Sequence, residues 1–257
     1  MFNPAAFTEA LHMTIASFEA VGFLVAGIHA WALLRKPSEL HRSALRIALV
    51  VGGVAALLQP LSGDLSARHV AEVQPVKLAA MEGLWETQAG APITIGGWPI
   101  EDEERTVLGL EIPYGLSLLA HHDPHAEIMG LKDVPVEDRP PVATTHVAFQ
   151  IMVGCGTLLA ALALLGGLLA WRGRLEDPRY LRALVFAAPL GLVAVEAGWV
   201  VTEVGRQPWV IHGVMRTADA VTPMPHLVVP FTLFTLLYAV LGVVVVTLLR
   251  RHVFLTT

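Results

Sequence analysis

Five apolar stretches dominate the sequence, at residues 11–34, 45–62, 143–171, 183–204 and 227–249. A helix needs about 20 apolar residues to cross the hydrocarbon core of a bilayer. The second stretch is the shortest, and Pro60 near its end predicts an early stop. Charged residues make up 15% of the chain, against about 25% in soluble domains. The sequence therefore predicts an all-α integral membrane protein, a bundle of about five transmembrane helices with one long outer loop.

Basic residues indicate the expected orientation of these helices. Lysine and arginine gather after the first stretch, after the third stretch and in the tail after the fifth. They are Arg35, Lys36, Arg42, Arg46, Arg172, Arg174, Arg179, Arg182, Arg250 and Arg251. Basic loops of membrane proteins favour the cytoplasmic side, and the long connection of residues 63–141 is acidic. We therefore expect the N-terminus and the long loop outside, and the C-terminus inside.

Ionisable side chains within the apolar stretches are candidates for function, because charge is costly in a bilayer. They are His12, Glu19, Glu196 and Glu203. His12 and Met152 are expected at similar depth near the outer ends of two different helices. Neutral imidazole and thioether form a low-spin haem ligand pair. Considered singly, each has a simpler interpretation: an interfacial histidine bonded to a carbonyl, and a methionine in apolar packing.

A second group of residues lies on the fourth stretch. Glu196, Trp199 and Glu203 recur at spacings of three and four, which place them on one helical face. Arg206 follows one turn later. A carboxylate on such a face can carry protons, pair with arginine or bind a metal. The spacing alone favours an interfacial ion pair between Glu203 and Arg206.

The long loop begins with a helical pattern. The segment Val73 to Thr87 predicts a short amphipathic helix with Leu78, Met81 and Trp85 on one face. The rest of the loop is rich in glycine, proline and charge, so it does not predict a further span. His146, just after the loop, is expected to be an interfacial histidine.

Several motifs resemble subunit I of cytochrome bd-type quinol oxidases. They are Gln74–Thr87, Val195–Trp199 leading into Glu203–Trp209, Phe149–Gly156, and His12 with Ala16, Ser17 and Trp31. The resemblance covers nearly the whole chain but corresponds only to the C-terminal half of that subunit. It implies a quinol:oxygen oxidoreductase of the respiratory chain in a bacterial cytoplasmic membrane.

The resemblance implies a role for each matching residue in electron entry. His12 and Met152 would be the axial ligands of a low-spin haem b. Lys77 and Glu82 would bind quinol and take up its protons. Residues 1–62 would carry the histidine ligand, 63–141 the quinol-binding loop and 142–257 the remaining haem ligands.

The resemblance also implies an oxygen-reducing pair of high-spin haems, haem b and haem d. Glu203 would ligate one of these irons, with Trp199 beside the haems and Arg206 against haem propionates. Electrons would pass from quinol through the low-spin haem to this pair. Glu196 is a weaker candidate for proton handling.

The sequence departs from the family pattern in several places. Gln150 stands where the family often has arginine, and Glu19 and His29 have no counterpart that we can name. Four further helices, which in the family precede this region and supply another haem histidine, have no match here. We expect a naturally split subunit, whose partner chain supplies the N-terminal half and shares the high-spin haem pair; a reduced paralogue is the alternative. Further expected partners are cytochrome bd subunit II, small accessory subunits and membrane lipid, but no nucleic acid.

Three other functions remain open from the sequence. The first is a single-haem, quinol-linked electron-transfer subunit that reduces no oxygen. The second is a transporter whose ion path uses Glu19, Glu196 and Glu203. The third is a structural assembly subunit. Bound haem would distinguish the transporter from the others, and high-spin haem would distinguish the oxidase from the single-haem subunit.

Overall fold

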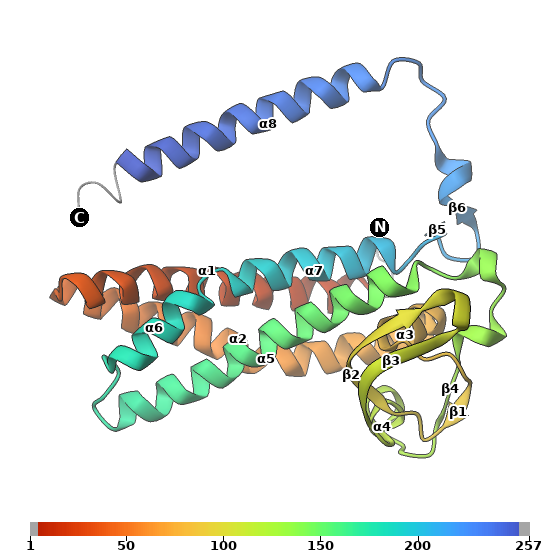
Figure 1. Cartoon of the computed structure of the whole chain (residues 1–257), viewed down its shortest axis with the longest axis horizontal. Helices are drawn as coiled ribbons and strands as arrows, with labels where there is room; N and C mark the ends of the chain where they lie inside the picture. The colour runs from red at the N-terminus through yellow and green to blue at the C-terminus, as the bar shows by residue number, and fades with distance from the viewer. Residues whose placement is uncertain (1–4, 252–257) are drawn as a thin grey trace. The chain divides into compact units, whose positions relative to one another are not determined.

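The computed structural model describes residues 5–251 and divides into two units, residues 1–217 and 218–257. The first unit contains α1 (Ala6–Arg35), α2 (Glu39–Val73), α3 (Pro75–Glu82), β1 (Gln88–Ala89), β2 (Ile93–Ile100), η1 (Glu101–Glu103), β3 (Arg105–Ile112), α4 (Gly115–His121), β4 (Glu127–Ile128), η2 (Leu131–Asp133), η3 (Val136–Asp138), α5 (Val142–Trp171), α6 (Pro178–Ala187), α7 (Leu190–Val204), β5 (Trp209–Ile211) and β6 (Met215–Arg216). A short 3-10 helix, η4 (Thr217–Ala220), spans the division, and the second unit contains α8 (Val228–Leu249). The α-helices and strands are labelled in Figure 1.

Five helical segments of the described chain are long and apolar enough to cross a membrane. They are Ala6–Arg35, Glu39–Val73, Val136–Trp171, Pro178–Val204 and Val228–Leu249. The predicted fold class, a bundle of about five transmembrane helices, is confirmed. The fourth segment consists of two helices, α6 and α7, with Pro189 between them. Proline interrupts a helix because it lacks the N–H that the preceding turn needs.

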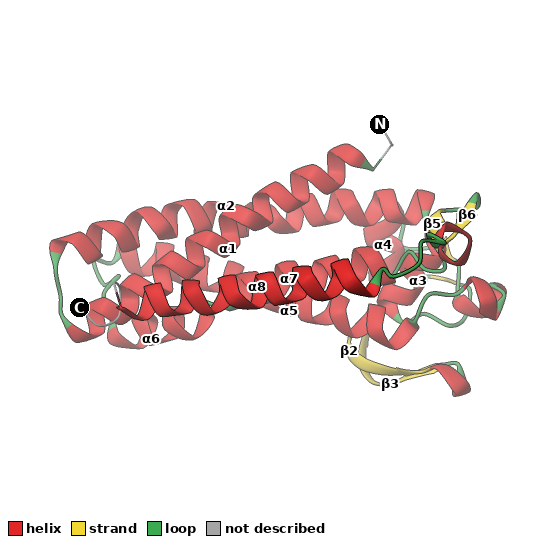
Figure 2. Ribbon diagram, turned by 90° about the horizontal axis from the view of Figure 1, so that it is seen from above, coloured by secondary structure: helices red, strands yellow, loops and turns green. Residues whose placement is uncertain are grey.

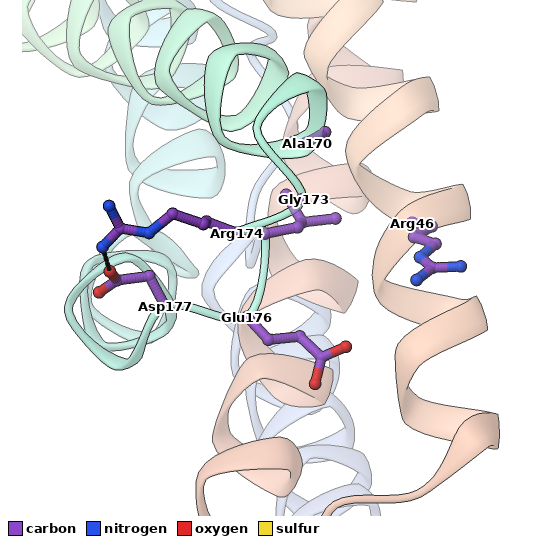
Figure 3. Close-up of a pocket in the computed structure, with 7 residues that line it drawn as sticks. Arg46, Ala170, Gly173, Arg174, Glu176 and Asp177 are labelled. Carbon is purple, nitrogen blue, oxygen red and sulfur yellow. Dashed lines mark hydrogen bonds and ion pairs between the residues drawn. The ribbon is translucent and has the colours of Figure 1, made fainter.

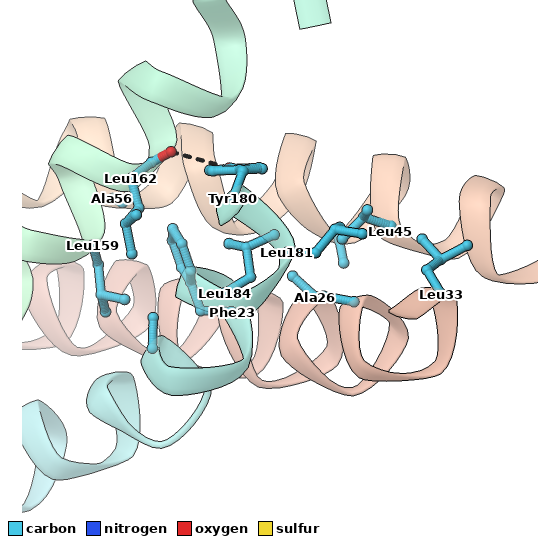
Figure 4. Packing of buried hydrophobic residues seen from close by; sticks show 13 residues of the cluster. Phe23, Ala26, Leu33, Leu45, Ala56, Leu159, Leu162, Tyr180, Leu181 and Leu184 are labelled. Carbon is cyan, nitrogen blue, oxygen red and sulfur yellow. Dashed lines mark hydrogen bonds between the residues drawn. The ribbon is translucent and has the colours of Figure 1, made fainter. Parts of the chain in front are cut away.

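Small residues bring α1 and α2 into close contact. A side chain added at Gly22 would collide with the backbone of Gly52, and one added at Gly52 would lie 3.0 Å from Gly22 Cα. Small residues at helix crossings allow such close approach of backbones inside membranes. Beside this crossing, α1, α2, α5 and α6 share a buried cluster that includes Phe23, Leu45 and Leu184 (Figure 4).

The helix α2 is longer than the sequence analysis expects. The predicted stop at Pro60 is wrong, because the helix continues through this residue to Val73. Beside the proline, the Ser62 hydroxyl donates a 2.9 Å hydrogen bond to the Gln59 carbonyl. The helix ends where Gln74 precedes Pro75, a position that disfavours helical backbone.

The 74–141 segment is a small folded region rather than an irregular loop. The predicted amphipathic helix is present as the shorter α3. The strands β2 and β3 form an antiparallel hairpin that pairs Ile93 with Ile112 and Ile100 with Arg105 (Figure 2). The sequence does not predict this hairpin. Among residues 5–251, three two-stranded sheets accompany the helices.

The helix α8 is apolar along most of its length, and its threonine hydroxyls bond internally. The hydroxyls of Thr232, Thr235 and Thr247 each donate to a backbone carbonyl four residues earlier, at 2.7–2.8 Å. Internal bonding of this kind satisfies these three donors without water, as a lipid environment requires.

Candidate functional site

Two charged side chains are buried on the short helix α3. Lys77 is 8% exposed and Glu82 is 2% exposed. Their burial follows from the position of α3, which packs against α2 and α5 and shares a buried apolar cluster with Leu116 and Val142. Gly83 ends the helix in the left-handed conformation, with φ of 64°. Buried charged groups without a close opposite charge are uncommon and mark candidate functional sites.

Glu82 lies at the end of α3, facing the first strand of the hairpin. One of its carboxyl oxygens, Oε2, accepts a 3.3 Å hydrogen bond from the backbone N–H of Thr94. Burial raises the pKa of Glu82 from its ordinary value of 4.5 to about 7, and the Thr94 N–H opposes this shift. The carboxyl can therefore gain or lose a proton near neutral pH.

Lys77 lies one helical turn and a half before Glu82. Its side chain passes close to Gly205, where an added Cβ would lie 3.4 Å from Lys77 Cε. Burial is the main cause that lowers the pKa of Lys77. Glu9 and Glu203 oppose this lowering of the pKa, and Arg206 adds to it. The residue thus feels charges on the first helix and at the end of α7.

His12 on α1 is held by two polar side chains of α2. Its Nδ1 lies 3.0 Å from Ser62 Oγ, and its Nε2 lies 3.1 Å from the amide nitrogen of Gln59. The Ser62 hydroxyl hydrogen is used by the Gln59 carbonyl, so Ser62 Oγ acts as an acceptor toward the ring. We infer from this network that Nδ1 carries the proton and that Nε2 presents its lone pair.

Met152 on α5 faces α7. An added Cβ at Gly198 would lie 3.1 Å from Met152 Sδ, so the missing side chain of this glycine leaves room for the thioether. Within residues 5–251 no hydrogen bond joins His12 to Met152: the first contacts α2 and the second contacts α7. Their sharing of one iron stays a prediction.

The residues predicted at the end of α7 are largely exposed in this chain. Glu203 and Arg206 form an ion pair at 2.5 Å, with side chains 47% and 41% exposed. Trp199 is 51% exposed, and Glu196 is also exposed. The ion pair that the spacing favours is therefore present. Glu196, Trp199 and Glu203 form an unburied face on α7, and Arg206 follows directly after the helix.

Two residues of α5, His146 and Gln150, hold the hairpin in place. His146 is fully buried, with its ring nitrogens 2.8 Å from the carbonyls of Met81 and Gly96. The folded 74–141 segment covers His146, and its expected depth at the membrane interface stays a prediction. Gln150 donates to the Thr94 carbonyl at 2.7 Å and accepts from the Gly96 N–H at 2.9 Å.

A separate hollow of about 560 Å³ lies at the other end of α2 and α5. It is lined by Arg46, Ala170, Gly173, Arg174, Leu175, Glu176 and Asp177 (Figure 3). Arg174 pairs with Asp177 there at 2.9 Å. The hollow lies among charged loop residues and contains none of the predicted site residues.

Comparison with known proteins decides the family. A family model described as cytochrome bd terminal oxidase subunit I matches residues 1–255. This chain belongs to that family. The buried Lys77 and Glu82 and the polar setting of His12 are accordingly features of a cytochrome bd subunit I sequence.

Related proteins agree with this assignment. A putative cytochrome bd menaquinol oxidase subunit I of Bacillus subtilis is 38% identical over 98% of this chain, and the match covers 59% of that protein. Cytochrome bd-II ubiquinol oxidase subunit 1 of Escherichia coli is 29% identical, with 63% covered. The solved structure of bd oxidase from Geobacillus thermodenitrificans matches with a TM-score of 0.87 and 38% identity, over 97% of this chain and 58% of that one. The chain thus spans about three fifths of the length of these relatives.

Within this cytochrome bd fold, some residues around His12 and Glu82 were not identified from the sequence. Ser62 and Gln59 lie three residues apart, a spacing that places them on one face of α2. Because the helix was expected to end near Pro60, this shared face was not recognised. Gln150 was visible only as a departure from the family pattern. Its partners are backbone atoms of a hairpin about 55 residues earlier, and no local pattern predicts such contacts.

Proposed function

We propose that this chain forms the quinol-oxidising and low-spin haem-binding part of a cytochrome bd-type terminal oxidase, a quinol:oxygen oxidoreductase. The observation that carries this proposal is the burial of Lys77 and Glu82 on one short helix of the motif that resembles the family's quinol loop. A carboxyl with a pKa of about 7 is suited to accept a proton at neutral pH. The names of the curated relatives, menaquinol and ubiquinol oxidase subunits, support the same substrate class.

Quinol oxidation releases two electrons and two protons, and this chain offers groups for the protons. Glu82 in its carboxylate form would accept a proton from a quinol hydroxyl. The Thr94 N–H would keep the carboxyl in place during the transfer. Lys77, whose ammonium has no hydrogen bond or ion pair with any residue of the described part, is free to donate to a quinol oxygen.

The residues predicted to hold a low-spin haem b fit that group. The Ser62 contact assigns the proton of His12 to Nδ1. The Nε2 lone pair, which accepts from the Gln59 amide here, would bind iron once Gln59 moves aside, and a contact such as that with Ser62 commonly orients a histidine ligand. Buried Gln59 Oε1, beside this ring, has no hydrogen-bond partner among residues 5–251. Met152 would supply the second ligand. When bound, the haem would accept the electrons of quinol one at a time.

The oxygen-reducing part of the proposal involves α7 and partners. Glu203 would ligate one iron of a high-spin pair of haem b and haem d, with Trp199 beside it and Arg206 against propionates. The exposure of this face is consistent with a covering group or chain. Since the relatives are longer, the proposed partners are the remaining helices of subunit I, a cytochrome bd subunit II and small accessory subunits.

The protein is a multi-pass membrane protein, and we propose a bacterial cytoplasmic membrane with the 74–141 segment and the N-terminus outside and the C-terminus inside. Quinol oxidised on that side would release protons outside. The alternative function is a single-haem electron-transfer subunit without oxygen reduction. One observation favours it: Glu203 already has a partner in Arg206.

Substitution of the two buried groups tests the quinol site. Glu82→Gln is expected to slow quinol oxidation by the purified complex at least about 100-fold, the lower end of the range typical of a proton-transfer group, and Lys77→Met is expected to slow it as well. Oxygen consumption with an artificial electron donor should stay near the wild-type rate. Lys132→Met is the matched control, because Lys132 lies in the same segment but forms a surface ion pair with Glu86. An equal loss with both donors would place Lys77 and Glu82 outside quinol oxidation.

A haem-resolved spectrum with a subunit inventory tests the rest. The proposal expects one low-spin and two high-spin haems, together with polypeptide that accounts for the remaining length of subunit I. A single low-spin haem without high-spin signal would instead establish the electron-transfer alternative.

A further inference from the structure

A continuous hydrogen-bond network joins Glu82 to the helix α5. The carboxyl of Glu82 is bonded to the N–H of Thr94, and the carbonyl of Thr94 accepts from Gln150. The N–H of Gly96 donates to the same Gln150 amide, and the carbonyl of Gly96 contacts His146. His146 then contacts the carbonyl of Met81, the residue before Glu82. The network is therefore a closed ring through α3, β2 and α5.

From this ring we propose that Gln150 is a positioning residue for quinol oxidation. Together with His146 it holds β2 against α5 through hydrogen bonds, a contact that we call the dock. The dock fixes the Thr94 N–H and, through it, the position of the Glu82 carboxyl. The proposal rests on the function proposed above and adds a residue that acts through another. Gln150 does not itself need to touch the substrate.

The chemistry of the glutamine amide explains why this residue type suits the site. An amide side chain has both a donor and an acceptor, and Gln150 uses one toward the Thr94 carbonyl and the other toward the Gly96 N–H. It thus bonds to β2 as a neighbouring strand would. A side chain with donors alone could satisfy only the carbonyl.

The backbone of β2 is shaped for this contact. Gly96 and Gly97 have φ of 68° and 94°, conformations that glycine adopts readily and other residues avoid. They turn the N–H and the carbonyl of Gly96 toward Gln150 and His146, which lie one helical turn apart on α5. The other strand, β3, pairs with β2 along its length and is anchored separately where Thr106 bonds to Trp85 and to the Gly83 carbonyl. Gln150 and His146 therefore fix the β2 side of the hairpin.

The contacts of Gln150 with β2 also connect the Glu82 region to the helix that carries the predicted iron ligand. Gln150 lies two residues before Met152, the predicted iron ligand, on the continuous helix α5. Any tilt or shift of α5 therefore carries the Glu82 region with it. This arrangement keeps a fixed spatial relationship between Glu82, the proposed proton acceptor, and α5, which carries the predicted haem ligand Met152.

The test uses the whole purified complex with Gln150→Met, a substitution of similar length that removes both bonds. We expect a rise of about fivefold to tenfold in the KM for quinol, the scale of one or two lost hydrogen bonds. The rate with an artificial donor and the low-spin haem absorbance should stay within about twofold of wild type. Amide hydrogen exchange should accelerate in peptides that cover Ile93–Ile100.

A control and a second variant complete the design. Thr144→Val alters an exposed residue of the same helix and is expected to behave as wild type. His146→Gln, which retains N–H donors but cannot reach both carbonyls together, should raise KM in the same direction by a smaller factor. If Gln150→Met assembles poorly, this milder variant still decides the question.

Two results would overturn the proposal. Unchanged exchange in Ile93–Ile100 would show that Gln150 does not hold the hairpin. Faster exchange with an unchanged quinol KM would show that the dock is structural only. If the wild-type complex did not oxidise quinol, both the proposed function and the positioning role would be wrong. Amide hydrogen exchange in Ile93–Ile100 would still show whether Gln150 holds the hairpin.

Discussion

His12 and Ser62 are joined by a 3.0 Å contact between Nδ1 of the imidazole and Oγ of the hydroxyl. Because the Ser62 hydrogen is directed to the Gln59 carbonyl, the contact selects one tautomer of His12. That tautomer has its lone pair on Nε2, the form a metal ligand needs. A helix–helix contact between α1 and α2 thus determines the chemistry of a side chain on α1.

Ser62→Ala is therefore predicted to weaken the low-spin haem site without removing a ligand. Loss of such a supporting contact commonly reduces metal affinity by about 10- to 100-fold. The measurement is the low-spin haem content per purified protein, followed during competition with a haem acceptor. Ser43→Ala, at an exposed position of the same helix, is the control. Equal haem retention in both variants would show that the tautomer of His12 is fixed by other means.

Removal of either predicted ligand should have a larger effect. His12→Ala or Met152→Leu is expected to abolish the low-spin spectrum and to leave some high-spin signal, because Glu203 lies on a different helix. Reduced-minus-oxidised absorption spectra of the purified complex provide the measurement. An unchanged spectrum in both variants would reject this ligand pair.

The membrane-spanning helices could be predicted because their signal is local. Apolar length alone locates α1, α5 and α8, and their observed bounds follow the predicted stretches closely. The end of α2 could not be predicted, because Pro60 is a local stop signal, whereas the helix that continues past it to Val73 packs along α1, a contact between segments that the local pattern does not contain.

The candidate site was predictable only in part, for the same physical reason. Lys77 and Glu82 belong to a contiguous motif, so their place on one short helix could be read from the sequence. The roles of Gln150 and His146 depend on carbonyl and N–H groups of a hairpin that no alternation of residues predicts. Hydrogen bonds between a side chain and a distant backbone have no sequence signature of their own.

The crossing of α1 and α2 gives a prediction about stability. Gly22→Ala adds a Cβ that would collide with the backbone of Gly52, and overpacking of this kind costs about 1–3 kcal/mol. Gly167→Ala is the control, because nothing lies within 4 Å of the added atom. Alanine favours helix over glycine by about 0.5–1 kcal/mol, so the control should be neutral or slightly stabilised. Thermal unfolding in detergent measures both, and equal melting temperatures would contradict the close crossing.

The pH dependence of quinol oxidation follows from Glu82. Its pKa of about 7 means that the carboxyl is mostly protonated, and unable to accept a proton, below that pH. We expect kcat/KM for quinol to rise with pH up to about 7 and then to level off. Glu82→Gln should remove this rise and leave a low, flat profile, while Glu86→Gln at an exposed position should retain it.

The same pKa determines a matching change in stability. Burial raises the pKa of Glu82 above its ordinary value of 4.5, so the folded state binds this proton more tightly than the unfolded state. The resulting stabilisation is complete below pH of about 4.5 and is lost as pH rises through about 7. Glu82→Gln cannot lose this stabilisation, because its side chain does not titrate. Its melting temperature should therefore rise relative to that of wild type as the pH increases from about 4.5 to about 7. If the difference in melting temperature between the two proteins stayed constant across this pH range, Glu82 would not titrate there. It would then not be the proton acceptor for quinol near neutral pH.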